Sequence, residues 1–316
     1  MNVITTPEIN TYGSYARASL LADYIELLAL KGQSVKLAIL ADFLADNSWN
    51  LELIRLPEND CPDNDLGRLS AQLDDAHEVA SVVFRQIVER QEVLAERYPF
   101  EITDNAIVLN CGVDLEANPY AAVLALTIAH AFNVNSIHRP HEMFEQIVLR
   151  VLQDRGLSSA GVAMHRRGGN SFEEALQIAC EEIGLKAQPN AAPRRTRAQD
   201  EGVDILCHIG WEKDLRPGAW GFIGQVTVGR SDSWENKIRE PSPSQWKLFT
   251  GTMVPPTPFL AVPHHVERRM MEFLTSKSDA IVLDRLRLVG SKREIGADER
   301  DLIRAVIGAD VEPLLG

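Results

Sequence analysis

Apolar residues recur at helical spacing through most of the first 140 residues. The segments SLLADYIELLALKG, SVKLAILADFL and YAAVLALTIAHAFNV place apolar side chains three and four residues apart, which is typical of helices that bury one face. A longer amphipathic run from Leu66 to Phe100 predicts a helix that breaks once near Asp74-Asp75. The single strand-like stretch here is EITDNAIVLN. We therefore expect a helical bundle over this part of the chain.

The periodicity changes near residue 138. Two helical segments come first, EMFEQIVLRVLQDRGL and SFEEALQIACEEIGL, and the second opens with Ser171 and Glu174 at the spacing of a capping box. Beyond a polar loop follow four short β-rich runs, VDILCHI, WGFIGQVTVG, FLAVPHHV and DAIVLDRLRLV. We therefore expect an α+β protein, with a helical domain over residues 1–137 and an α/β domain over residues 138–316.

Composition narrows the class of protein. The first residues lack a basic stretch followed by an apolar core, and no apolar run approaches the roughly 18 residues that span a bilayer, so we expect a cytoplasmic protein without membrane contact. The cysteines, which form no CxxC pair, are Cys61, Cys111, Cys180 and Cys207. This spacing favours reduced thiols over a zinc site or a disulfide framework.

Charge is distributed unevenly along the chain. Residues 1–140 carry 9 Lys and Arg against 20 Asp and Glu, whereas the remaining 176 residues carry 23 against 25. Because phosphate binding follows local potential rather than total charge, the second region can bind DNA despite the net charge of −13. Two loop clusters supply arginines that either contact phosphates or lie solvated: Arg166, Arg167, Arg194, Arg195 and Arg197.

A carboxylate and a carboxamide are expected to meet in the second region. Asp204 opens the run VDILCHI, and Gln225 lies in WGFIGQVTVG. The connection Trp211–Trp220, with the turn residues Pro217-Gly218, has the length of an antiparallel hairpin that sets the two strands side by side. Hard Mg²⁺ ions prefer such oxygen ligands, and hydrolysis of a phosphodiester also needs a cation near the attacking water.

This pattern resembles the PD-(D/E)XK, restriction-endonuclease-like nuclease superfamily. The matching features are Gly202-x-Asp204, the D-x-R-x-G segment 214–218, the Gly-Gln pair ending at Gln225, and the W-x-x-K segment 234–237. More narrowly, the chain resembles a branch of prokaryotic restriction and phage-defence proteins in which Gln replaces the usual Glu. The resemblance covers about residues 140–290 and implies a nuclease domain with a central mixed β-sheet.

The resemblance also implies roles for individual residues. In that superfamily an acid on the helix before the sheet, the Asp of the first strand and the (D/E/Q)-x-K of the next strand assemble the site. By position, Asp204 and Gln225 are the expected ligands of Mg²⁺ or Mn²⁺. The lysine position holds Thr227, so we expect Lys237 to supply the positive charge, as some members carry the lysine on the following helix.

The helix acid has two matches in the sequence. Phe144-Glu145 and Phe172-Glu173-Glu174 both fit the family's first helix, and the second is closer to Asp204 along the chain. Glu173 or Glu174 is therefore favoured as the catalytic acid, with Glu173 as a metal ligand, and Glu145 remains the other candidate. The alternative role for Glu174 is to cap its helix.

Other polar residues carry weaker expectations. His138-Arg139-Pro140-His141 predicts a helix start, and only one of His264 and His265 can enter a site, because adjacent side chains of an extended chain point opposite ways. His208 is expected on the same strand face as Asp204. The segment Asp284-Arg285-Leu286-Arg287 ends the last β-rich run, where a D-R-x-R pair is typical of the resembling branch, and predicts an internal salt bridge.

The leading hypothesis is a Mg²⁺-dependent DNA endonuclease of a prokaryotic restriction or anti-phage system. Its acidic helical region would dock a protein partner, such as an ATPase or helicase subunit, or regulate access, and homo-oligomers remain possible. The alternative is an adaptor subunit that keeps the nuclease fold, has lost its chemistry and recruits an ATPase or helicase. Thr227 and the acidic excess of the first region favour this alternative.

Overall fold

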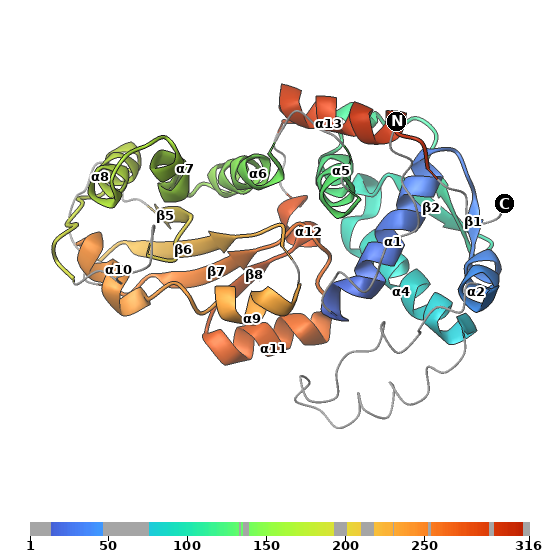
Figure 1. Cartoon of the computed structure of the whole chain (residues 1–316), viewed down its shortest axis with the longest axis horizontal. Helices are drawn as coiled ribbons and strands as arrows, with labels where there is room; N and C mark the ends of the chain where they lie inside the picture. Colours follow the sequence, from blue (N-terminus) through green and yellow to red (C-terminus); the bar gives the residue numbers. More distant parts are fainter. Residues whose placement is uncertain are drawn as a thin grey trace.

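Helices form most of the described part of the first region. The computed structural model describes residues 14–46, 76–132, 134, 139–192, 201–209, 218–229, 231–251, 254–290 and 294–311. The helices of the first region are α1 (Ser14–Leu30), α2 (Leu37–Asp46), α4 (Ala76–Leu94) and α5 (Pro119–Ala131). Figure 1 shows them to the right of the larger sheet. They follow the predicted apolar periodicity, although the proposed break near Asp74-Asp75 lies outside the described residues.

A small antiparallel sheet accompanies these helices. Strands β1 (Val35–Lys36), β2 (Phe100–Thr103) and β3 (Ala106–Leu109) pair in the order β1-β3-β2. Asp104 and Asn105, which join β2 to β3, both have positive φ, the conformation that a two-residue hairpin requires. The sequence predicted one strand in EITDNAIVLN, and these two turn residues divide the stretch into a hairpin.

The second region contains a mixed five-stranded sheet. Its strands are β4 (Ser158–Gly161), β5 (Ile205–Ile209), β6 (Trp220–Val226), β7 (Thr257–Ala261) and β8 (Ile281–Leu283). They lie in the order β4-β5-β6-β7-β8, with β4, β5 and β6 antiparallel and with β7 and β8 parallel to β6. The mixed sheet and the α+β class are as predicted. Strand β4 was missed because its sequence, SSAG, has no β-branched or aromatic residue.

Helices surround this sheet and extend beyond it. They are α6 (Pro140–Asp154), α7 (Val162–Arg167), α8 (Phe172–Glu182), α9 (Trp234–Lys237), α10 (Pro243–Phe249), α11 (Arg268–Ser278), α12 (Arg285–Leu288) and α13 (Ala297–Gly308). Helix α6 begins with Pro140 at its first turn, as predicted. Among the helices in the described ranges, none is long and apolar enough to cross a bilayer.

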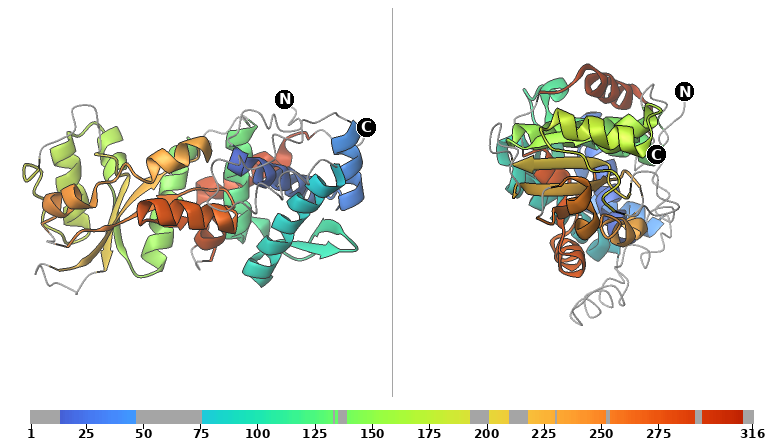
Figure 2. Two further views of the ribbon diagram at one scale, coloured as in Figure 1. Left: turned by 90° about the horizontal axis from the view of Figure 1, so that it is seen from below. Right: turned by 90° about the vertical axis from the view of Figure 1, so that its left-hand side faces the viewer.

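The two faces of the sheet are covered by different helices. Ser159 of β4 donates its hydroxyl hydrogen bond to the Leu149 carbonyl of α6, and its partner Cys207 shares that face. Gly224 also lies there, where the ring of Phe259 crosses so closely that a side chain at residue 224 would overlap it. On the other face, Leu260 packs with α9 and α11. Figures 1 and 2 show α6 and α11 on opposite sides of the sheet.

The two regions share one hydrophobic core. A single buried cluster contains residues of α1, α4 and α5 together with residues of α6, β5 and β7. Helix α13, near the end of the chain, packs on α5, and its Arg304 pairs with Glu116 at 2.5 Å between Nη2 and Oε2. The two regions are therefore in extensive contact with each other. The domain boundary near residue 137 remains a prediction.

A cluster of buried charges also joins the two regions. Both Nη atoms of Arg285 lie 2.6 Å from the carboxylate oxygens of Asp23 on α1. Arg90 of α4 lies 2.8 Å from Asp23 and 2.8 Å from Glu26, and all four side chains are fully buried. We call Asp23, Glu26, Arg90 and Arg285 the buried charge cluster. Although burial opposes ionisation, Arg285 and Arg90 hold the pKa of Asp23 below its usual value.

This cluster corrects one prediction. Arg285 was expected to pair within the segment Asp284–Arg287, but its partner is Asp23, which is distant in the sequence. Asp284 instead caps α12 by accepting a hydrogen bond from the Arg287 amide. The sequence pattern showed that these charges are paired and could not show with which residue.

Candidate functional site

Asp204 and Gln225 lie on neighbouring strands, where β5 begins and β6 ends. The register pairs Ile205 with Gly224, and Asp204 and Gln225 are the residues adjacent to this pair. The Asp204 amide donates to the Gly224 carbonyl at 2.8 Å, and its Oδ2 accepts from the Val226 amide at 2.7 Å. Asp204 is 9% exposed and Gln225 is 3% exposed. The two strands are antiparallel neighbours, as predicted, and both predicted ligands lie at the same end of this strand pair.

The turn before Asp204 needs a glycine. Gly202 has a φ of +73°, and a Cβ at this position would lie 3.0 Å from the backbone of Glu240. The chain immediately after α9 is thus pressed against the turn that presents Asp204. This contact brings the end of α9, where Lys237 lies, toward the start of β5.

A second carboxylate, Glu145, approaches from α6. Glu145 is 3% exposed, and both of its oxygens accept hydrogen bonds from the guanidinium of Arg167, with 2.9 Å between Nη1 and Oε1. Arg167 is the last residue of α7. Its pKa is raised, first by the hydrogen bond to Glu145 and further by the charges of Glu142 and Asp204. Glu145, Arg167 and Asp204 therefore belong to one electrostatic cluster.

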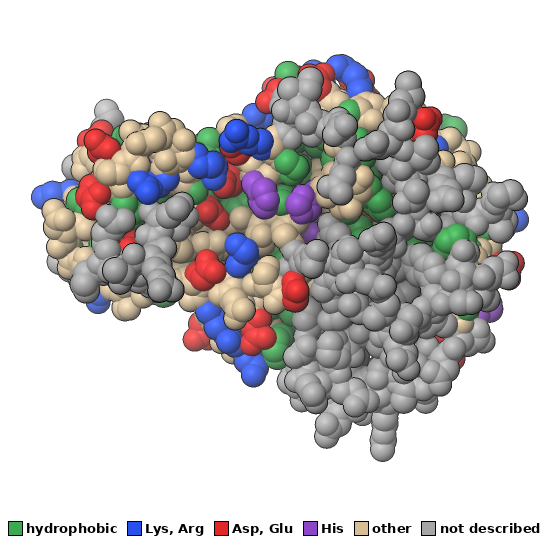
Figure 3. All heavy atoms as spheres, viewed as in Figure 1, with side chains coloured by type: hydrophobic (Ala, Val, Ile, Leu, Met, Phe, Trp, Pro, Cys, Tyr) green, Lys and Arg blue, Asp and Glu red, His purple; other side chains and the backbone are tan. Residues whose placement is uncertain are grey.

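Lys237 and two histidines border this cluster. His141 lies one helical turn before Glu145 on α6, so the two side chains share a helix face. Burial lowers the pKa of His141, and the charges of Lys237 and Arg167 lower it further. The ring of His130 on α5 lies 5.8 Å from that of His141. Figure 3 shows histidines beside basic and acidic side chains near the start of α6.

The strand position expected to carry a lysine has a structural role. Thr227 is 2% exposed, and its hydroxyl accepts a hydrogen bond from the Gly229 amide at 3.0 Å. Trp234 of α9 then donates its indole N–H to the Gly229 carbonyl at 3.4 Å. Thr227 thus fixes the turn that connects β6 to α9. Because Thr227 carries no charge, a positive charge on this side of the sheet has to come from another element. The helix that follows this turn is α9, and it carries Lys237.

The side chains reach the site from different directions. Gln225 shares its strand face with Ile223 and with its β7 partner Leu260, whereas α6 packs on the other face. Glu145 therefore approaches from the α6 side and Gln225 from the α9 side. Asp204 lies between them, because it precedes the regular part of β5 and its carboxylate turns toward the Val226 amide.

The α8 glutamates have another setting. The Ser171 amide donates to Glu174 Oε2 at 2.7 Å, and the Glu174 amide donates to Ser171 Oγ at 3.2 Å, which completes the predicted capping box. Glu174 is exposed, and Glu173 is half-buried beside it. The sequence favoured these residues as the helix acid because they are closer to Asp204 along the chain. The carboxylate that the structure joins to Asp204 through a shared arginine is Glu145.

Other predicted residues also have structural partners. Arg166 donates to the Asn170 carbonyl, and Arg167 pairs with Glu145 while its side chain remains 38% exposed. His208 lies 2.5 Å from the Ile183 carbonyl through its Nε2. Both His264 and His265 are buried. The predicted residues outside the described ranges are His138, Arg194, Arg195, Arg197, Asp214 and Arg216.

The sequence offered Glu145 as one candidate for the helix acid, but it did not identify His141 as a residue of the site. His141 and Glu145 stand four residues apart on a predicted helix, a spacing that places both on one face and was a usable signal. The pairing of Arg167 with Glu145 had no such signal, because the two residues are 22 positions apart and on different elements. Only the fold brings them together.

The side chains at this end of the sheet include oxygen donors of the kind that hard divalent cations prefer. Asp204 and Glu145 offer carboxylate oxygens and Gln225 offers a carboxamide oxygen, all of them buried, but Glu145 and Gln225 approach from opposite faces of the sheet. Within the part of the chain that the structure describes, no group of three His, Cys, Asp or Glu residues converges as a preformed metal site. The positive charge beside Glu145 and Asp204 is instead that of Arg167. The positively charged group at this place is therefore a side chain of the protein, the guanidinium of Arg167.

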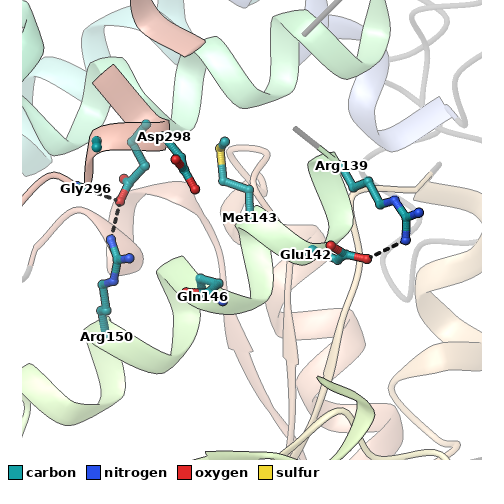
Figure 4. Close-up of a pocket in the computed structure, with 9 residues that line it drawn as sticks. Arg139, Glu142, Met143, Gln146, Arg150, Gly296 and Asp298 are labelled. Carbon is teal, nitrogen blue, oxygen red and sulfur yellow. Dashed lines mark hydrogen bonds and ion pairs between the residues drawn. The ribbon is translucent and has the colours of Figure 1, made fainter. Parts of the chain in front are cut away.

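A cavity of about 310 Å³ lies on the outer side of α6, between that helix and the start of α13. Figure 4 shows two ion pairs at its walls, Arg139 with Glu142 at 2.9 Å and Arg150 with Glu299 at 2.8 Å. Glu142 also lies 3.8 Å from Arg167, between its Oε1 and the arginine Nε. The cavity is therefore adjacent to the carboxylate cluster, although it is lined by none of the residues predicted for catalysis.

Comparison with protein-family models, with curated proteins and with solved structures finds no match to this chain.

Proposed function

We propose that this protein is a Mg²⁺- or Mn²⁺-dependent DNA endonuclease that acts within a prokaryotic restriction or anti-phage system. The observation that carries the proposal is the position of Asp204 and Gln225 at the same end of adjacent antiparallel strands, with Glu145 bound to Arg167, whose pKa is also raised by the charge of Asp204. Their order along the chain, helix acid, strand Asp and strand Gln, is that of the resembling nuclease superfamily. Lys237 on α9 provides the ammonium group that Thr227 lacks.

Each residue has a defined task in this proposal. A bound divalent cation would polarise the phosphodiester and lower the pKa of a water molecule. Asp204 and Gln225 would hold it, with Glu145 as the third oxygen donor. Lys237 would orient the attacking water and stabilise the negative charge that develops on the phosphate. The hydrogen bond from the Val226 amide fixes the Asp204 carboxylate before substrate arrives, which reduces the cost of ordering the site.

The test is cleavage of plasmid and linear DNA by the purified full chain with Mg²⁺ or Mn²⁺. We expect Asp204→Asn and Glu145→Gln to lower cleavage by at least about a hundredfold, because each removes a charged ligand. Lys237→Met should lower kcat with little change in DNA binding. Glu174→Gln is the matched control, since this glutamate caps α8, and it should retain cleavage. Equal activity of all variants would contradict the proposed site.

A second function is favoured by a different observation. Thr227 is buried as part of a turn and Glu145 is neutralised by Arg167, features that a nuclease fold without chemistry would also show. In this case the chain is an adaptor that recruits an ATPase or helicase through its acidic helical region. The adaptor is favoured if no DNA is cleaved with either metal even when a co-purifying ATPase or helicase is present. Cleavage that depends on Asp204 excludes it.

A further inference from the structure

We propose that Arg167 is an internal cation that occupies the acidic centre and has to leave Glu145 before a divalent metal can bind there. This inference rests on the proposed function, because it concerns the same site. It assigns to Arg167, predicted from the sequence as a phosphate contact, the role of a gate. By gate we mean that the oxygens of Glu145 become available to a metal ion only when Arg167 has moved away from them.

The first support is the way in which Glu145 is occupied. Two guanidinium nitrogens donate hydrogen bonds to its two oxygens, so Arg167 neutralises the charge of the carboxylate and uses one lone-pair direction of each oxygen. A metal ion that binds the same oxygens would meet the positive charge of the guanidinium at close range. Asp204 lies within the field of the same guanidinium. Metal and arginine therefore compete for one location.

The second support is the difference in exposure between the two partners. The Glu145 side chain is 4% exposed and is fixed within α6, whereas the Arg167 side chain is 38% exposed. Arg167 ends a six-residue helix and is followed by Gly168 and by Gly169, whose φ is +97°. The arginine can thus turn outward at low cost, while the glutamate remains where it is. The movable member of the pair is the one that blocks the site.

The third support is a second carboxylate close to the guanidinium, Glu142, which already pairs with Arg139 at its exposed end. Glu142 lies 3.8 Å from Arg167 Nε and is 42% exposed, one helical turn before Glu145 on α6. Transfer of Arg167 from Glu145 to Glu142 exchanges one carboxylate partner for another nearer to solvent. A DNA phosphate arriving at the same edge would offer a further acceptor. Entry of DNA and entry of metal are then coupled, because the phosphate favours the outward position of Arg167.

The experiment measures Mn²⁺ binding to the full chain without DNA, by electron paramagnetic resonance and by calorimetry. Arg167→Gln should bind Mn²⁺ at least about tenfold more tightly than the unmodified protein, since it removes the competing charge. Arg268→Gln is the matched control, because it removes an exposed arginine that pairs with Glu272 on α11 and shares no partner with Arg167. It should leave the affinity unchanged. Combining Arg167→Gln with Glu145→Gln should abolish the gain.

The outcomes separate the gate from the proposed function. Equal Mn²⁺ affinity of Arg167→Gln and the unmodified protein, with binding that still depends on Asp204, overturns the gate and leaves the metal site. Failure of both proteins to bind Mn²⁺ overturns both proposals. Tighter binding by Arg167→Gln without any DNA cleavage supports the gate and contradicts the nuclease.

A conservative variant covers the case in which Arg167→Gln does not fold. Arg167→Lys keeps the charge but cannot make the two parallel hydrogen bonds of a guanidinium. We expect it to fold and to bind Mn²⁺ about threefold more tightly than the unmodified protein, between the two extremes. An unchanged affinity in this variant also overturns the gate.

Discussion

Two arginine–carboxylate clusters in this protein have the same chemistry and opposite surroundings. In the buried charge cluster, Arg285 holds Asp23 with both side chains at 0% exposure. At the candidate site, Arg167 holds Glu145 with a guanidinium that is 38% exposed. The first pair joins α1 to α12 across the two regions of the chain. The second joins two neighbouring helices at the end of the five-stranded sheet.

The surroundings determine what each pair can do. Arg285 also donates to the Pro263 carbonyl at 2.9 Å and to the Thr127 hydroxyl at 3.0 Å, and Tyr98 and Tyr120 donate to Glu26. Such a satisfied network leaves no low-energy alternative for its members. Arg167 has a second carboxylate within reach and solvent on one side. The same pair of functional groups thus forms a fixed joint in one place and a releasable contact in the other.

The largest expected effect is loss of the fixed joint. Arg285→Met leaves Asp23 buried beside Arg90 alone, and removal of one partner of a buried ion pair costs about 3–5 kcal/mol. We expect a fall of that size in the free energy of unfolding, measured by urea denaturation at pH 7. Because the cluster joins both regions, fluorescence and circular dichroism should still report one transition. A loss below about 1 kcal/mol would show that the cluster does not contribute to stability in this way.

The next effect depends on pH and on a histidine beside the same cluster. Burial lowers the pKa of His264 to about 3, from an ordinary value of 6.5. As the pH falls, the unfolded chain therefore takes up this proton before the folded protein does, and stability is lost from about pH 6.5 downward. By pH 5 the loss from His264 alone is about 2 kcal/mol.

Urea denaturation of the unmodified protein and of His264→Phe between pH 7 and 5 measures this contribution. The variant should show a shallower decline of the free energy of unfolding with falling pH. The ring of His264 lies 5.8 Å from that of Trp234, and phenylalanine retains an aromatic contact there. Parallel pH profiles for the two proteins would contradict the assignment.

The sequence predicted much of the candidate site because its signals are local. The sequence signals for this strand pair are Gly202 before Asp204, the length of the hairpin connection and the Gly-Gln pair. They lie close together in the chain and therefore predicted that Asp204 and Gln225 are on neighbouring strands. The capping box of Ser171 and Glu174 was likewise visible within four residues. Periodicity placed most of the helices and four of the five strands for the same reason.

What the sequence could not supply are partners that only the tertiary fold brings together. The contact of Glu145 with Arg167 depends on where α6 crosses the sheet, and nearness along the chain, which favoured Glu173 and Glu174, gives no indication of it. The pairing of Arg285 with Asp23 spans most of the chain. Strand β4, at the edge of the sheet, is held by its hydrogen bonds to β5 rather than by the β-propensity of its residues.

The third prediction concerns the releasable contact and is smaller than the first two. Arg167→Gln leaves Glu145 buried without its charged partner, but the position of Arg167 near solvent lets water reach the site. We expect a loss of about 1 kcal/mol in the free energy of unfolding without metal. Millimolar Mn²⁺ should restore most of this stability, because it binds the folded state and replaces the missing charge. Arg285→Met should gain nothing from Mn²⁺, and a similar gain in both variants would remove the contrast between the two clusters.

The smallest expected effect comes from an arginine–carboxylate pair that is fully open to solvent. On α11, Arg268 Nε lies 3.1 Å from Glu272 Oε1, with side-chain exposures of 84% and 64%. Water screens such a pair, and the order of two long side chains costs entropy, so Arg268→Met should change the free energy of unfolding by less than about 0.5 kcal/mol. The same denaturation experiment at low and high salt measures it. The ion pairs of Arg285, Arg167 and Arg268 thus form a series of increasing exposure. We expect the contribution of each pair to the free energy of unfolding to fall along this series. A loss for Arg268→Met as large as that for Arg167→Gln would mean that exposure does not set the strength of these pairs, and the contrast between joint and gate would then need another cause.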